Sequence, residues 1–258
     1  MKNFNLNFCC VLALLLCGQI VLGQNQAAPA ATSKTAEEMA KEYAAWTKVR
    51  DDWANFTRYR AANEKLGAPK PGENRVVFMG NSITDGWIRS NPEFFEGRPY
   101  VDRGISGQTT PQMLVRFKAD VIDLQPKVVV ILAGINDIAG NTGPSTFKMI
   151  EDNLAAMAFL ARSYGIKVIM SSILPAFDFP WKKGMEPAEK VVTMNAWIKD
   201  FAEKNKFIYL DYFSAFADER KGMPLKYSRD GVHPNKDGYL VMGPLADAAI
   251  AKALKQKK

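Results

Sequence analysis

The chain has 258 residues, of which 47% are hydrophobic and 24% charged, and this is the composition of an ordinary globular protein. It contains three cysteines and a single histidine, which excludes the common zinc sites that need several histidines from one chain. The net charge of +7 is spread without a basic stripe or a recognisable nucleic-acid-binding module, so nucleic acid is not an expected partner.

Residues 1–23 have the pattern of a secretory signal peptide. Lys2 supplies a positive start, and the apolar stretch 8–22 is too short for a stable membrane span. Val21 and Gly23 are small residues at the positions that precede a cleavage site. We therefore expect an exported protein, periplasmic or secreted after removal of this segment, with an N-terminal anchor as the alternative.

All three cysteines lie in this segment, so its removal leaves a chain without thiol catalysis, cysteine-bound metals or disulfides. A lipoprotein cleavage before Cys17 is disfavoured, because the bulky Leu16 would precede the cut. The mature domain must then depend on its hydrophobic core, which is feasible at this length.

The next residues form a predicted linker and a predicted helix. Residues 24–34 are rich in Ala and Gln and are expected to be flexible. Residues 35–74 are expected to hold an N-terminal helix packed on the core, which begins at a Thr35–Glu38 capping box and runs to about Leu66. The alternative is that its aromatic side chains form part of a substrate wall.

Residues 75–258 alternate short apolar runs with amphipathic stretches. The predicted strands are 75–79, 100–102, 127–133, 167–171 and 207–210, and the predicted helices lie near 110–124, 145–164, 188–204 and 236–254. Such alternation predicts an α/β fold, a three-layer α/β/α sandwich around a mostly parallel five-stranded sheet. Its active site is expected at the carboxyl ends of the strands.

Polar residues follow three of these predicted strands. Ser82 follows the first, at a sharp turn into a helix where a hydroxyl and a backbone N–H are both exposed. Gly107 follows the second and allows the backbone to approach a ligand, and the Asn136 amide after the third suits a developing oxyanion. Taken alone, each residue is more often a helix cap or part of a turn than a catalytic group.

The single histidine, His233, follows Asp230 by three residues in a loop rich in Gly and Pro. A carboxylate at this spacing reaches Nδ1–H of the ring and leaves Nε2 free to accept a proton from Ser82. A nucleophile, an oriented base and three hydrogen-bond donors together indicate acyl transfer.

The segments GNSITDGW, GISGQTT, GIND and DGVHPN resemble, in the same order, the conserved blocks of the SGNH hydrolase superfamily of GDSL-like esterases and lipases. The resemblance implies a flavodoxin-like fold that needs no cofactor and no metal. It implies that Ser82 is the nucleophile and that His233 is the base, oriented by Asp230. It also implies an oxyanion hole made of the Ser82 and Gly107 N–H groups and the Asn136 amide.

Two residues depart from the family pattern. Asn81 replaces the usual Asp but keeps an acceptor, while Ile135 stands where many members have a smaller residue.

The classical α/β-hydrolase is disfavoured, because Thr84 occupies the position of its second elbow glycine. The short spacing of acid and histidine is also foreign to that fold.

These patterns predict an exported serine ester hydrolase that forms an acyl-enzyme on short-chain O-acyl esters, foremost O-acetyl esters, of carbohydrates or other small molecules. The alternatives are a lipid acylhydrolase, a transacylase and a non-catalytic glycan-binding module. The side chains expected at the substrate rim are Trp87, Ile135, Phe179 and Trp181. The partner is the ester substrate, without a stable membrane span, and the sequence leaves the oligomeric state open.

Overall fold

The computed structural model of the protein describes residues 34–256. The predicted signal peptide and nearly all of the predicted linker therefore lie outside the described residues. The chain divides between Tyr43 and Ala44 into two units. In the first unit, Thr35 and Glu38 form the predicted capping box, with the Thr35 N–H donating to Glu38 Oε2 at 2.8 Å and the Glu38 N–H donating to Thr35 Oγ1 at 3.2 Å.

The predicted N-terminal helix is broken into three pieces. Helix α1 (Ala36–Asp51) ends well before Leu66, and a 3-10 turn, η1 (Phe56–Arg58), and helix α2 (Arg60–Leu66) follow it. The break occurs where the Asp52 carboxylate accepts two backbone N–H groups of η1, at 2.7 and 3.0 Å. A side chain that offers the backbone such bonds competes with a continuous helix. The packing of the segment 35–74 as a whole stays a prediction.

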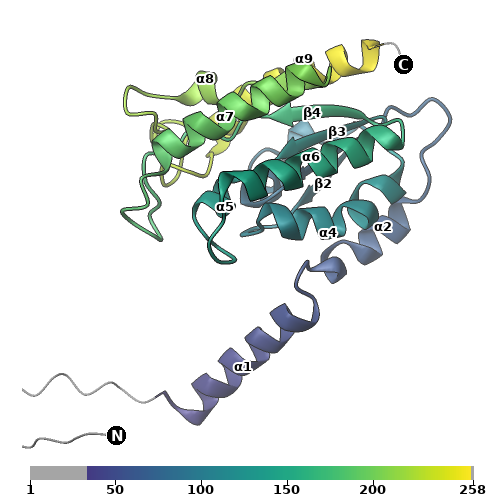
Figure 1. The fold of residues 1–258 in the computed structure, drawn as a ribbon. Coiled ribbons are helices and arrows are strands. Elements are labelled where there is room, and N and C mark those ends of the chain that lie inside the picture. Colours follow the sequence, from purple (N-terminus) through teal and green to yellow (C-terminus); the bar gives the residue numbers. More distant parts are fainter. Residues whose placement is uncertain (1–33, 257–258) are drawn as a thin grey trace, which may run out of the picture. The chain divides into compact units, whose positions relative to one another are not determined.

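The described part of the second unit is built on a parallel five-stranded sheet (Figure 1). Its strands are β1 (Val76–Gly80), β2 (Tyr100–Gly104), β3 (Val128–Leu132), β4 (Lys167–Ser171) and β5 (Ile208–Leu210). Their order is β2-β1-β3-β4-β5, with every neighbouring pair parallel. This is the flavodoxin-like order, and it confirms the predicted fold class.

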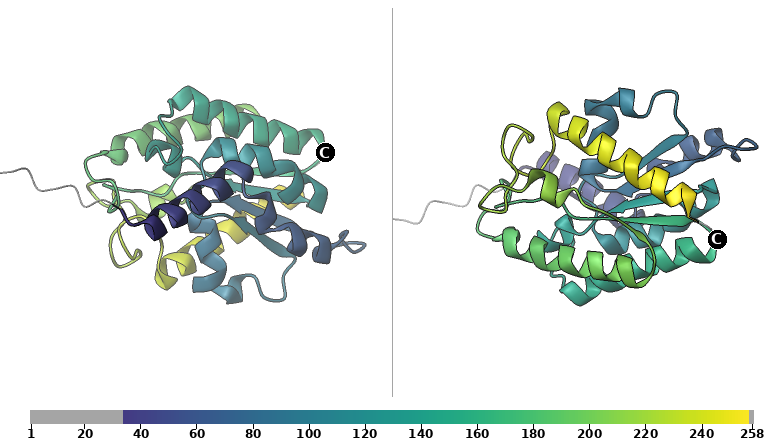
Figure 2. Two further views of the ribbon diagram at one scale, coloured as in Figure 1. Left: turned by 90° about the horizontal axis from the view of Figure 1, so that it is seen from below. Right: turned by 90° about the horizontal axis from the view of Figure 1, so that it is seen from above.

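Helices cover both faces of the sheet (Figure 2). The longer ones are α3 (Ser82–Ser90), α4 (Thr110–Asp120), α6 (Phe147–Ser163), α7 (Pro187–Lys204) and α9 (Lys236–Lys255). The short ones are η2 (Pro92–Phe94), η3 (Ile122–Leu124), α5 (Ile135–Ile138) and α8 (Phe213–Phe216). Helices α4, α6 and α7 pack on one face, and α3 and α9 pack on the other.

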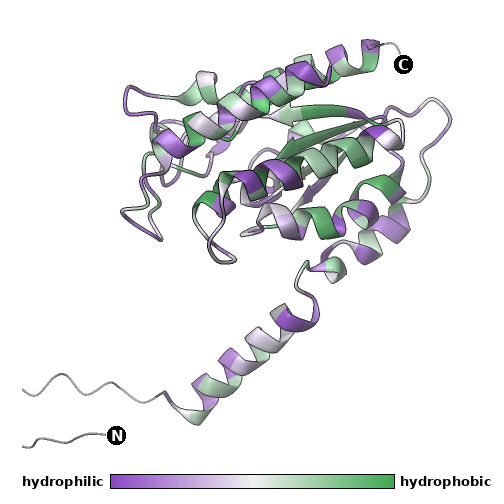
Figure 3. Cartoon of the chain, viewed as in Figure 1, coloured by the Kyte–Doolittle hydropathy of each residue, from purple (hydrophilic) through white to green (hydrophobic). Residues whose placement is uncertain are grey.

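Strands β1 and β3 are apolar on both faces, which explains their uninterrupted hydrophobic runs (Figure 3). In β1, Val77 and Met79 join the core under α4, α6 and α7, whereas Val76 and Phe78 join the core under α3 and α9. Among residues 34–256 no helix has the length and apolarity needed to cross a membrane.

Candidate active site

Ser82 is the first residue of α3, directly after β1. Asn81 caps this helix, with its Oδ1 accepting the Ile83 N–H at 3.3 Å, so the Asn retains the acceptor role expected of it. The turn is tight enough to require glycine at its start, because a Cβ on Gly80 would lie 1.9 Å from Thr84 Oγ1. The sharp turn keeps the Ser82 side chain at the carboxyl edge of the sheet.

Ser82, His233 and Asp230 form one chain of hydrogen bonds. Ser82 Oγ lies 2.9 Å from His233 Nε2, and His233 Nδ1 lies 2.8 Å from Asp230 Oδ2. The second carboxylate oxygen, Asp230 Oδ1, accepts the backbone N–H groups of Val232 and His233 at 3.0 and 2.8 Å. A single carboxylate therefore holds both the loop and the imidazole ring in place.

The electrostatics of Asp230 suit this arrangement. Its partial burial alone would raise the pKa of the carboxyl, but hydrogen bonds from the backbone and ring of His233 outweigh the burial and hold the pKa below its usual range. An ionised Asp230 keeps the proton on Nδ1 and directs the Nε2 lone pair toward Ser82.

The two other residues predicted for the oxyanion hole border the same cleft, which has a volume of about 440 Å³. Gly107 has a φ of 81°, a conformation that favours glycine. The Asn136 amide donates one hydrogen to the Gln108 carbonyl at 2.9 Å, which leaves its second hydrogen available. The structure thus brings all five residues predicted for catalysis to one cleft.

Asp137, next to Asn136 in α5, bonds the first residue of α4. Its carboxylate accepts the Thr110 backbone N–H at 3.0 Å and the Thr110 hydroxyl at 2.6 Å, at the start of α4. Burial raises the pKa of Asp137 to about 6, although these hydrogen bonds oppose the rise. The residue therefore ties the loop after β3 to the loop after β2.

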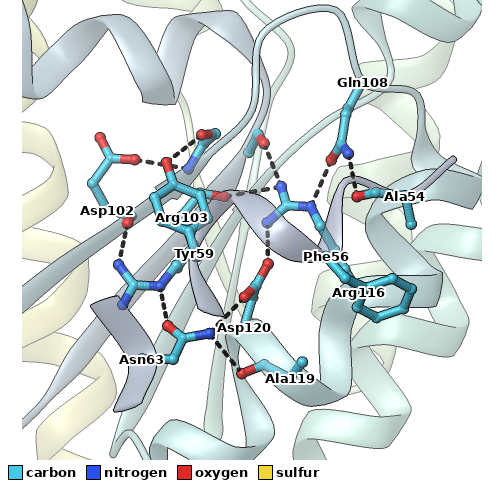
Figure 4. Close-up of polar contacts among 12 residues, drawn as sticks. Ala54, Phe56, Tyr59, Asn63, Asp102, Arg103, Gln108, Arg116, Ala119 and Asp120 are labelled. Atoms are coloured by element: carbon cyan, nitrogen blue, oxygen red, sulfur yellow. Dashed lines mark hydrogen bonds and ion pairs between the residues drawn. The ribbon is translucent and has the colours of Figure 1, made fainter. Parts of the chain in front are cut away.

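A fully buried arginine, Arg116 of α4, bonds the side chain of Gln108, the residue after Gly107 (Figure 4). Its guanidinium donates to the Gly80 carbonyl at 3.0 Å, the Arg103 carbonyl at 2.9 Å and Gln108 Oε1 at 2.5 Å. Asp120 accepts its remaining bond at 2.9 Å. Arg116 thus joins the ends of β1 and β2 to the residue whose carbonyl holds Asn136.

The sequence analysis missed Arg116, although its position carried a usable signal. The buried stripe of α4 has the helical spacing of Met113, Arg116, Phe117 and Asp120. Two of these four inward positions carry opposite charges, and buried charges of this kind are usually paired and functional or structural.

The segment before β1 also contributes to this polar network (Figure 4). Asn63 of α2 donates to Asp120 at 2.8 Å and accepts from Arg103 Nε at 2.8 Å. The Tyr59 hydroxyl donates to the Gly104 carbonyl, and the Gln108 amide donates to the Ala54 carbonyl at 2.8 Å. Residues 54–63 therefore support the loops that follow β2.

The predicted substrate rim is largely wrong. Trp181 lines the cleft, is 46% exposed and lies 5.7 Å from the His233 ring, measured between ring centroids. Phe179 is buried and stacks on Trp181 at 5.1 Å, while Trp87 and Ile135 are buried in the two cores. The inward face of α3 carries Trp87 away from the cleft.

The cleft is lined by polar, cationic and aromatic side chains. Besides the predicted catalytic residues it is bordered by Gly86, Arg89, Ser106, Asn141, Trp181, Arg229, Pro234 and Tyr239. In the described part of the chain, no group of three or more His, Cys, Asp and Glu side chains is arranged to hold a metal ion.

Two solved structures with high identity match more than three quarters of this chain. A GDSL-like lipase from Bacteroides thetaiotaomicron is 46% identical, with a TM-score of 0.76 over 78% of this chain and 98% of that chain. An acylhydrolase from Bacteroides fragilis is 45% identical, with a TM-score of 0.77 over 79% of this chain and 99% of that chain.

Curated relatives match over shorter stretches. An acetylxylan esterase from Geobacillus stearothermophilus is 28% identical over 55% of this chain and 67% of its own length. The lipoprotein YqeF from Bacillus subtilis is 36% identical over 30% of this chain, and the match spans only 33% of that protein.

A family model described as GDSL-like lipase/acylhydrolase matches residues 78–241, a stretch that begins within β1 and ends within α9. This match covers the loops that hold Ser82, Gly107, Asn136, Asp230 and His233. The chain therefore belongs to the GDSL-like lipase/acylhydrolase family of the SGNH hydrolase superfamily, a family of carboxylic ester hydrolases.

Proposed function

We propose that this protein is an exported serine esterase that removes short acyl groups, foremost acetyl, from carbohydrate or other small-molecule esters. The observation that carries the proposal is the continuous hydrogen-bonded chain from Ser82 Oγ through His233 to Asp230, at 2.9 and 2.8 Å, inside a cleft that also holds Gly107 and Asn136.

The reaction proceeds in two halves. His233 Nε2 accepts the Ser82 proton as Oγ forms a bond to the ester carbonyl carbon. The tetrahedral intermediate collapses by breaking the bond to the alcohol oxygen, which takes the proton from His233. Water then attacks the acyl-enzyme, with His233 again accepting and returning one proton, and releases the carboxylic acid and free Ser82.

The oxyanion of each tetrahedral intermediate is stabilised by three donors: the Ser82 and Gly107 N–H groups and the free hydrogen of the Asn136 amide. Asn136 is held for this task by its bond to the Gln108 carbonyl. A donor fixed in advance costs no reorganisation during the reaction, and removing one such donor typically lowers the rate by about 10²–10³.

Cleft size and lining support a short acyl group on a polar alcohol. The cleft measures about 440 Å³ and is bordered by Ser106, Asn136, Asn141 and two arginines. A long acyl chain would need a continuous apolar wall, whereas the apolar side chains of this lining are limited to Trp181, Pro234 and Tyr239. Trp181 offers an exposed indole face of the kind that packs on sugar rings, and one relative is named an acetylxylan esterase.

Export is proposed from the signal-peptide pattern of residues 1–23, and a B. subtilis relative named as a lipoprotein is consistent with it. Finding the expressed protein in its host's cytoplasm with residues 1–23 intact would contradict this part of the proposal.

The catalytic assignment is tested with Ser82→Ala and His233→Ala on 4-nitrophenyl acetate and on longer-chain esters. We expect turnover to fall by at least about 10⁴-fold in both variants, and the wild type to prefer acetyl over longer acyl groups. Ser163→Ala, which removes an exposed serine on α6, is the matched control. Near-normal turnover in either active-site variant would overturn the assignment.

A covalent serine probe separates an esterase from a binding module. A fluorophosphonate should label the wild type and Ser163→Ala but not Ser82→Ala. Absence of labelling in the native protein would favour a non-catalytic module, and acylated products with sugar acceptors would indicate a transacylase.

A further inference from the structure

The cleft extends from Ser82 along one face of α3. Residues 82, 86 and 89 are four and three positions apart, which places them on the same side of a helix. Gly86 has no side chain, and the Tyr239 hydroxyl lies close to it, since a Cβ at Gly86 would lie 2.8 Å from that oxygen. Both residues line the cleft, and Gly86 lies between Ser82 and Arg89 on this side of α3.

Two guanidinium groups stand at this far end, from Arg89 on α3 and from Arg229 in the loop that carries Asp230 and His233. Arg89 is 59% exposed and is held by Asp85 through bonds of 2.9 and 3.3 Å. Asp85 in turn accepts the Ser106 hydroxyl and pairs with Arg58 at 3.5 Å. Two arginines thus share this one carboxylate.

Arg229 has no such neutralisation within the described residues. Its backbone N–H donates to the His233 carbonyl at 2.9 Å, and its guanidinium donates to the uncharged Ser90 hydroxyl. The carboxylate that lines the cleft, Asp230, is already committed to His233 and Val232 through both of its oxygens. The Arg89–Arg229 end of the cleft therefore carries an uncompensated positive charge.

We propose that Arg89 and Arg229 form a subsite for an anionic group, a carboxylate or a phosphate, carried by the ester substrate. This inference rests on the proposed function, since it assigns the charge of the substrate that Ser82 attacks. Guanidinium groups bind carboxylates and phosphates through paired hydrogen bonds, and Arg229 is already oriented by its bond to Ser90. Holding the side chain in advance reduces the entropy lost on binding.

The spacing defines the kind of ester that fits. Arg89 lies seven positions after Ser82 along α3, which corresponds to about 10 Å of helix rise. The Arg89 side chain reaches back over part of this length, since its guanidinium bonds Asp85. A single six-membered ring between the ester and the anionic group therefore spans the gap, as in an acylated sugar acid or sugar phosphate.

The test compares matched acetyl esters that differ in charge. The anionic probes are 4-acetoxybenzoate and 4-acetoxyphenyl phosphate, and the neutral probe is methyl 4-acetoxybenzoate. We expect the wild type to favour at least one anionic probe by about tenfold or more in kcat/KM, since hydrogen bonds to charged groups are strong. The preferred probe identifies the anion as a carboxylate or a phosphate.

The assignment to arginine is tested by the same ratio in variants. Arg229→Gln, which keeps a donor for Ser90, should lose most of the preference, and Arg229→Lys should retain part of it. Lys252→Gln removes an equal charge from α9 outside the cleft and should keep the full preference, which controls for the overall positive charge of the protein.

A wild-type ratio near one for both anionic probes would overturn the inference, as would a ratio that Arg229→Gln and Lys252→Gln leave equally intact. Failure of the proposed function looks different. It would appear as wild-type turnover of the neutral ester that Ser82→Ala does not abolish.

Discussion

Asp230 combines two tasks in one carboxylate, because one oxygen bonds the imidazole and the other bonds the backbone of the same loop. Asp230→Asn keeps the shape but replaces one oxygen with an NH₂ group. If that group faces Nδ1, it favours the tautomer with its proton on Nε2, which cannot accept a proton from Ser82. We expect kcat to fall by about 10³–10⁴ with little change in KM. Steady-state kinetics on 4-nitrophenyl acetate check this, and a KM effect alone would contradict it.

We expect Gln108 and Arg116 to position the proposed oxyanion hole, since Arg116 donates to Gln108 Oε1 and the Gln108 carbonyl accepts the Asn136 amide. Gln108→Ala should lower kcat by about 10–100-fold with a small change in KM, because a displacement near 1 Å can cost that much. Gln108→Glu, which still accepts from Arg116, should retain most of the activity.

Gln112→Ala is the matched control for this prediction. Gln112 also donates to a carbonyl of the N-terminal segment, that of Trp53 at 2.8 Å, but its Oε1 accepts from Thr109 rather than from Arg116. Its loss should affect stability and leave kcat close to the wild-type value. Equal kcat effects in Gln108→Ala and Gln112→Ala would indicate a general structural role instead.

Among the secondary-structure elements, α3 and the end of β2 approach each other backbone to backbone. A Cβ on Gly104 at the end of β2 would lie 2.1 Å from the Asp85 nitrogen and 2.7 Å from its Cα, and backbone cannot move aside as a flexible side chain does. Gly104→Ala should therefore destabilise the protein by about 3 kcal/mol or more and shift Ser82 with α3. Urea unfolding measures the loss, and a wild-type transition midpoint would contradict the close approach.

The elements themselves were predictable to different degrees. Strand β4 was predicted with its observed bounds, and the other strands to within about two residues. The reason is that apolar segments covered by helices on both faces differ sharply in hydropathy from the residues on either side of them. The single helix expected to Leu66 was wrong. The aromatic side chains of this segment keep a helical spacing on both sides of the break, so the pattern gives no sign of it. The break depends on the Asp52 carboxylate, which accepts backbone N–H groups of η1.

For the whole molecule, the buried carboxyls predict how stability depends on pH. Burial raises the pKa of Asp102 to about 7 and that of Asp137 to about 6. Between about pH 4 and these values the folded state holds protons that the unfolded state releases, so stability falls as the pH rises and levels off above the folded pKa. Asp85 and Asp230 have lowered pKa values despite their burial. Their contribution to the stability of the folded state is therefore lost only as the pH falls below about 4.

We therefore expect the thermal midpoint to be highest near pH 5 and to decline toward pH 8. The side chain introduced by Asp102→Asn cannot ionise, so this variant should show a smaller decline. The difference between the thermal midpoints of the variant and the wild type should therefore shift in favour of the variant as the pH rises. Calorimetry of both proteins across this range checks the prediction. Parallel curves would contradict it.

The fold class and the proposed catalytic residues follow from local patterns in the sequence. Apolar runs define strands, and the residues just after them must meet at one edge of a parallel sheet. Ser82 and His233 are 151 positions apart, yet each belongs to a short block that is recognisable alone. The direction in which a helix side chain points is different, because only packing decides which side of α3 faces the core. For this reason Trp87 is buried while Trp181 borders the cleft. The Arg116 network and the Arg89–Arg229 pair are formed by side chains far apart in the chain, so they appear only once the helices are docked on the sheet.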